Sequence, residues 1–169
     1  MKRSLFLSFF LIFLLVSCNS PYRRVKGDGF SIRVLKSMRS YKGQMLNNAL
    51  LEYADTKMDL NLVVERDTLN TSSLDSAQKV LVDYFIKPDI LESTYKVFPL
   101  RHHRGEHIEA VTVEENSDGS ITQLYWTIGL FPGKNNTYYI VWVWTNRIHR
   151  PDNEYIMKKM INSFKVLDK

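Results

Sequence analysis

The chain has 169 residues, of which 44% are hydrophobic, 24% charged and 12% aromatic, and its formal net charge is +5. These fractions exclude an intrinsically disordered chain, and the length predicts a single domain. The single cysteine excludes an intramolecular disulfide framework and a cysteine-rich zinc module.

Residues 1–17 have the pattern of a secretory signal peptide. Lys2 and Arg3 precede an apolar run, Leu5–Val16, which is too short to span a bilayer as a helix. The motif LVSC that ends at Cys18 resembles the lipobox of bacterial lipoproteins. That resemblance implies cleavage before Cys18 and diacylglycerol on its sulfur, and two or three acyl chains anchor a protein stably. The alternative is an ordinary secretory signal that happens to end near a cysteine.

Removal of the signal peptide changes the charge balance of the chain. The formal charge falls to +3, because 21 basic residues then oppose 18 acidic ones. Arg23, Arg24 and Lys26 lie in a polar tether predicted for residues 18–28, where each would gain about 1 kcal/mol near anionic lipid. The domain predicted for residues 29–169 has nearly balanced charge, so no nucleic-acid partner is expected.

The residue after the cysteine bears on location. Asn19, not aspartate, follows Cys18, and no acidic run comes after it. By resemblance to the sorting rules of diderm lipoproteins, this implies an outer-membrane anchor that faces the periplasm.

Alternating apolar and polar residues predict three strands in the first half of the mature chain. These strands are expected at residues 30–36, 49–53 and 59–65. A helix follows, with Ser72 and Asp75 at the spacing of a capping box and Pro88 beyond its end.

Four further strands and a second helix are expected in the other half. The strands are expected at residues 94–100, 107–114, 121–131 and 138–146. Turn-forming residues at 116–119 and 132–136 separate the last three strands. Asp152 is the expected cap of the final helix, whose apolar stripe consists of Ile156, Met157, Met160, Ile161 and Phe164.

The segment Tyr138–Trp144 is apolar at both strand parities, which is typical of a strand buried on both faces of its sheet. With two amphipathic helices available, the order of elements predicts an α+β fold. In this fold one antiparallel sheet is flanked by helices on both faces.

This order of elements, with the phrases FSIRVLKSM, TYYIVWVWT and INSFKV, resembles the Mog1/PsbP-like superfamily from Gly29 to Val166. Leu35 departs from the pattern, since many relatives have proline there. The resemblance implies an α/β/α sandwich and a monomeric scaffold for binding or assembly, as in the photosystem oxygen-evolving subunit and the Ran-binding Mog1. No partner-binding residues carry over, because no motif here matches theirs.

Three of the four histidines, His102, His103 and His107, lie close together, and Glu109 follows them. Imidazole and carboxylate groups at short range suit zinc, copper or nickel, and a turn at Arg104 would let His103 approach His107. A solvated polar hairpin is the alternative, because adjacent histidines on a strand point to opposite faces.

The aromatic residues of the later strands allow two interpretations. Large aromatics on adjoining strands favour a core, but some of them could line a ligand groove. Tyr125 and Tyr139 are expected at the less buried parity and are therefore the predicted binding surface. The carboxylates from Glu106 to Glu115 are expected on an exposed strand and turn.

No motif for nucleophilic, nucleotide-dependent or zinc-dependent catalysis occurs, and no cofactor is expected. The leading hypothesis is a lipid-anchored, non-enzymatic module that binds a protein or another envelope component. The alternative is a periplasmic lipoprotein that binds a small ligand or a metal through the histidine hairpin or the aromatic sheet face. An enzyme with paired carboxylates in a cleft is the third hypothesis.

Overall fold

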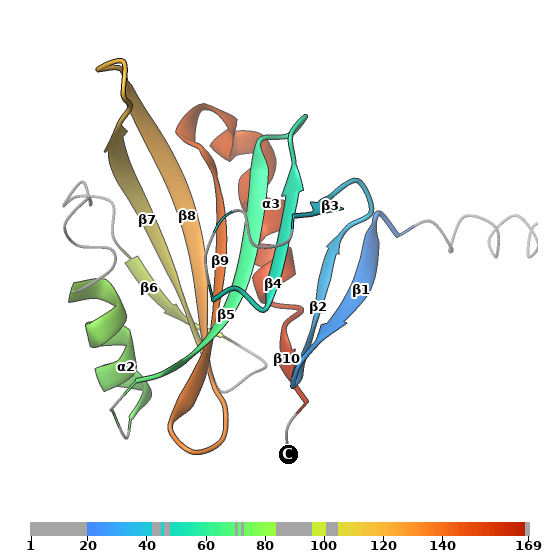
Figure 1. Cartoon of the computed structure of the whole chain (residues 1–169), viewed down its shortest axis with the longest axis vertical. Coiled ribbons are helices and arrows are strands. Elements are labelled where there is room, and N and C mark those ends of the chain that lie inside the picture. Colours follow the sequence, from blue (N-terminus) through green and yellow to red (C-terminus); the bar gives the residue numbers. More distant parts are fainter. Residues whose placement is uncertain are drawn as a thin grey trace, which may run out of the picture.

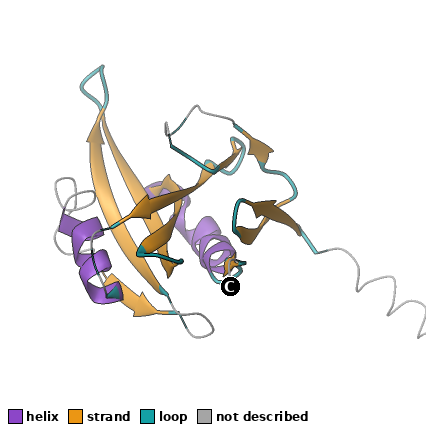
Figure 2. Cartoon of the chain, turned by 60° about the horizontal axis from the view of Figure 1, so that its bottom comes forward, coloured by secondary structure: helices purple, strands orange, loops and turns teal. Residues whose placement is uncertain are grey.

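The computed structural model describes residues 20–41, 45, 48–69, 71, 73–83, 96–100 and 105–167. These residues are mainly strand, with two α-helices (Figure 2). The strands form two antiparallel sheets, one with seven strands and one with three. Both sheets and both helices are seen in Figure 1.

The larger sheet contains every strand expected after the first. In spatial order its strands are β3 (Arg39–Ser40), β4 (Leu51–Asp55), β5 (Leu60–Thr68), β9 (Thr137–Asn146), β8 (Ile121–Pro132), β7 (Glu106–Glu115) and β6 (Lys96–Pro99). The strand with apolar residues at both parities, β9, lies at the centre, where neighbours on both sides complete its hydrogen bonds. The short β3 was not predicted.

The smaller sheet corrects two expectations. It consists of β1 (Tyr22–Gly27), β2 (Phe30–Leu35) and β10 (Lys165–Val166), with β2 in the middle. The expected first strand therefore does not belong to the main sheet. Residues 22–27, expected in the tether, pair with β2 along their whole length, so the folded part begins earlier than residue 29.

Two tight turns fix the register of β7, β8 and β9, as predicted. The amide of Asn116 donates to the carbonyl of Ser120 at 2.8 Å, and Gly119 has a φ of 78°, which glycine adopts without strain. In the next hairpin Asn135 and Asn136 have φ values of 53° and 57°, which asparagine tolerates better than most residues.

The helices start at other residues than expected. Helix α2 (Leu74–Leu81) is capped by Ser73, whose Oγ accepts from the amide of Ser76 at 3.2 Å; the expected cap, Ser72, lies outside the described residues. A 3-10 turn, η4 (Arg147–His149), leads into α3 (Arg150–Ile161), so the predicted cap Asp152 lies within its first turn. No described helix has the length and apolarity needed to cross a bilayer.

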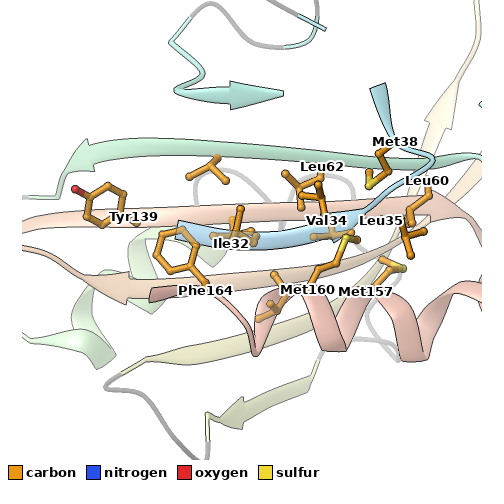
Figure 3. Packing of buried hydrophobic residues seen from close by; sticks show 14 of the residues in the cluster. Ile32, Val34, Leu35, Met38, Leu60, Leu62, Tyr139, Met157, Met160 and Phe164 are labelled. Carbon is orange, nitrogen blue, oxygen red and sulfur yellow. The ribbon is translucent and has the colours of Figure 1, made fainter. Parts of the chain in front are cut away.

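The main core lies between β2, one face of the larger sheet and α3 (Figure 3). Phe164, just after α3, is fully buried at its centre. Its ring centroid lies 4.4 Å from that of Phe131 and 5.3 Å from that of Phe30. These contacts join the last residues of the chain to β2 near its beginning.

A second core lies on the opposite parity of the same strands. Ala77 and Leu81 of α2 pack there against Ile128 and Leu130 of β8. In Figure 1, α2 stands beside the lower end of the sheet, away from the β7–β8 turn. The described chain is mainly sheet and α2 has only eight residues, so full coverage by helices on both faces is not confirmed.

Candidate functional site

All three tryptophans of the chain line one hollow of about 480 Å³. Trp126 on β8 and Trp142 on β9 pack at the border of the second core, beside the part that α2 contacts. Trp144 lies directly opposite Trp126 in the β8–β9 ladder. We call this hollow the tryptophan groove. Its described lining residues are Met45, Glu65, Glu114, Leu124, Trp126, Trp142 and Trp144.

The three indoles hold one another in place and remain partly exposed. The rings of Trp126 and Trp144 stack at 4.9 Å, and Trp142 stands edge-on to Trp126 at 6.1 Å. The Nε1–H of Trp126 donates to Thr112 Oγ1 at 2.8 Å. Because both neighbouring rings and a hydrogen bond restrict Trp126, the groove has a largely preformed aromatic wall.

Two carboxylates belong to the groove. Glu65 of β5 accepts a 2.5 Å hydrogen bond from Nε1 of Trp142. Burial raises the pKa of Glu65, the Trp142 bond opposes that rise, and the charge of Asp67 adds to it. Glu114 of β7 is exposed and lies at the same hollow. Among the described lining residues there is no basic side chain.

A second hollow of about 720 Å³ lies where β8 begins and where η4 follows β9, next in sequence to Leu124 of the groove. Two large apolar side chains stand exposed there, Ile121 at 68% and Ile148 at 75%. We call it the isoleucine hollow. Arg147 Nη1 donates to the side-chain oxygen of Gln123 beside it.

The opposite face of the same strands carries a compact ion network. Glu109 of β7 accepts from Lys158 of α3 at 2.7 Å, and Lys158 also contacts Glu154 at 2.6 Å. Burial would raise the pKa of Glu109, but the bonds from Lys158 and His107 and the charge of Lys158 hold it below its usual range. The exposed position expected for Glu109 is wrong, since the residue is 6% exposed.

The prediction that Tyr125 and Tyr139 form a binding surface is wrong, because each is 1% exposed and belongs to the main core. Burial and the nearby charge of Glu109 raise the pKa of Tyr125 to about 12. The guanidinium of Arg150 lies 4.3 Å from the Tyr125 ring centroid and covers it. The tryptophans, at the other parity of β8 and β9, are the partly exposed aromatic residues of these strands.

The histidine cluster is only partly described. His102 and His103 lie outside the described residues, so the metal site remains a prediction. His107 faces Phe98 across the β6–β7 pair, with the rings stacked at 4.9 Å, and its Nε2 lies 3.2 Å from Glu109 Oε1. In the described part of the chain, no three histidine, cysteine or acidic residues are grouped as metal ligands. Lys158 shares Glu109, which opposes a cation at that carboxylate.

Cys18 also lies outside the described residues, so its acylation and the signal peptide remain predictions. Glu65 was not expected at a site. The alternation in β5 could have indicated its position, because Asn61 and Glu65 share the polar parity of that strand. This parity lies on the same side of the sheet as Trp142 and Trp144 of the neighbouring β9.

Comparison with solved structures shows a Mog1/PsbP-like fold. A mutant of the protein Mog1 has a TM-score of 0.62 and 11% identity, with 89% of this chain and 98% of that chain covered. The Ran-binding protein Mog1p of Saccharomyces cerevisiae has a TM-score of 0.58 and 13% identity, with 89% and 97% covered. The PsbP protein of the cyanobacterium Synechocystis has a TM-score of 0.53 and 8% identity, with 89% and 95% covered.

At these identities the likeness concerns the fold alone. No family model and no curated protein matches the sequence. The fold expectation drawn from the resemblance is therefore confirmed at the level of antiparallel sheets with two helices.

Proposed function

We propose that this chain is a lipid-anchored protein of the bacterial cell envelope that binds a protein partner without catalysing a reaction. The binding surface is the tryptophan groove together with the isoleucine hollow. The observation that carries the proposal is the gathering of three partly exposed tryptophans in one groove, with two exposed isoleucines near the adjacent ends of β8 and β9. Contiguous exposed apolar surface marks interaction sites, and tryptophan is enriched among the residues that dominate binding energy.

The extent of this surface favours a protein over a small molecule. The tryptophan groove and the isoleucine hollow are lined by neighbouring residues of β8 and β9, and one small ligand would not fill both. The yeast Mog1p structure is described as that of a Ran-binding protein, which offers an example of protein binding on this fold.

The anchor is supported by the LVSC motif that ends at Cys18. Asn19 supports an outer-membrane position that faces the periplasm. Globomycin should cause the precursor to accumulate, and Cys18→Ala should abolish labelling with an acyl probe. Normal processing in globomycin together with unlabelled wild-type protein would refute the anchor.

The partner surface can be tested by crosslinking in the cell. A photo-crosslinking amino acid at Leu124 or Ile148 should give a discrete protein adduct, and Trp144→Ala should weaken it. The same amino acid at Tyr155, which is 68% exposed on α3, is the matched control. Equal adducts from all three positions, or adducts that persist unchanged in Trp144→Ala, would refute the proposed surface.

A small ligand is a second candidate, because the groove volume and its aromatic wall suit one. Native mass spectrometry of the full chain purified from its own envelope would then show an added mass that Trp144→Ala loses. Turnover of an envelope substrate by the purified full chain would contradict the non-catalytic part of the proposal.

A further inference from the structure

The tryptophan groove combines the two kinds of group that attract an organic cation. Indole faces attract cations through the negative π surface, and tryptophan does so best among the aromatic side chains. Glu65 and Glu114 add two carboxylates from strands on either side of the indoles. The wall of the groove is therefore mainly apolar, and its charged side chains are negative.

The carboxylate of Glu65 has no compensating cation among the described residues. It accepts from the neutral Nε1–H of Trp142, and the nearby charge of Asp67 is negative. Glu109, on the other face, has Lys158 at 2.7 Å and a lowered pKa, whereas the pKa of Glu65 is raised. A cation brought to Glu65 would remove an electrostatic cost that the free protein carries.

We infer that the tryptophan groove receives a basic side chain of the partner, arginine above all, between the indole faces and the carboxylate of Glu65, while Glu114 adds negative charge farther along the groove. This inference rests on the proposed function. A guanidinium is flat and weakly hydrated, stacks on aromatic faces and binds a carboxylate with two parallel hydrogen bonds. The groove of about 480 Å³ leaves room for the residues that flank the arginine in a protein segment.

Intrinsic fluorescence can test this directly, because every tryptophan of the chain lines the groove. The full chain in non-ionic detergent would be titrated with acetyl-Gly-Arg-Gly-amide and, as a nearly isosteric neutral probe, with the citrulline peptide. The arginine peptide should bind about fivefold more tightly or better. Equal affinity for the two peptides, or no saturable change with either, would overturn the inference.

Two conservative variants test the carboxylates. Glu65→Gln keeps an oxygen that can accept from Trp142 and removes only the charge. This variant should weaken binding of the arginine peptide about threefold or more and leave binding of the citrulline peptide unchanged. Glu114→Gln, at an exposed position farther along the groove, should weaken binding of the arginine peptide less. Asp152→Asn, which removes an exposed charge on α3, is the control and should change neither affinity. Unchanged binding of the arginine peptide in Glu65→Gln would overturn the inference.

Three further outcomes identify the source of the cation and distinguish the two proposals. Tighter binding of phosphocholine than of the arginine peptide would overturn the assignment to a basic side chain and indicate a lipid headgroup. Groove-dependent crosslinks without arginine preference would refute this inference alone. Arginine preference without groove-dependent crosslinks would refute the proposed protein partner in the cell.

Discussion

The two faces of the seven-stranded sheet use similar residues in opposite ways. On the α3 face, Glu109 and Glu154 both contact Lys158, and the aromatic rings are buried. On the other face, Glu65 and Glu114 have no basic partner among the described residues, and the indoles are partly exposed. The α3 face is complete within the chain, whereas the groove has aromatic surface and negative charge available for another molecule.

The largest expected effect concerns the core of the α3 face. Phe164→Ala should lower the free energy of unfolding by about 3–5 kcal/mol, because it removes a fully buried ring that contacts three others. Urea denaturation followed by circular dichroism would measure the loss. Tyr155→Ala, at an exposed ring, is the control; an equal loss in both variants would contradict the description of this core.

The ion network should give the next largest effect. Lys158→Ala leaves Glu109 nearly buried without its cation, and it should cost about 1–2 kcal/mol after solvent screening of the partly exposed lysine. Lys159→Ala, at the exposed neighbouring position, should cost less in the same urea experiment. A larger loss from Lys159→Ala than from Lys158→Ala would contradict the stabilising role given to the Lys158 ion pairs.

The groove should contribute less to stability than the core does. Trp144→Ala should lower the free energy of unfolding by about 1 kcal/mol, since the ring is only half-buried and loses mainly its stacking on Trp126. Thermal or urea unfolding would measure this value. A loss as large as that of Phe164→Ala would show that the tryptophans are core residues, and the contrast between the faces would fail.

The smallest effect concerns acid sensitivity. The pKa of Glu109 is lowered in the folded chain, so protonation favours the unfolded state and stability falls as the pH drops below about 4.5. Glu154 acts in the same direction. Glu109→Gln should therefore flatten the fall in unfolding free energy below that pH, measured by urea titration at several pH values. An unchanged slope would mean that other carboxylates dominate.

Much of the fold could be predicted because its strands alternate and its turns have distinctive residues. The partial exposure of the tryptophans could not be predicted, because β9 is apolar at both parities and its periodicity does not indicate which face is covered. Trp126 and Trp142 pack against the second core, to which α2 contributes, whereas Trp144 is not part of it. The burial of Glu109 could not be predicted either, because its partner Lys158 is distant in sequence. β1 was missed because an edge strand needs few apolar residues.

The early start of β1 would limit how far the folded part could move from a membrane if Cys18 carried the proposed lipid. Tyr22 is only four residues after Cys18, and four extended residues span at most about 14 Å. Arg23, Arg24 and Lys26 are exposed on this strand, so their spacing is set by the sheet. With lipid on Cys18, the folded part would stay close to the bilayer surface, and a partner would have to bind it there.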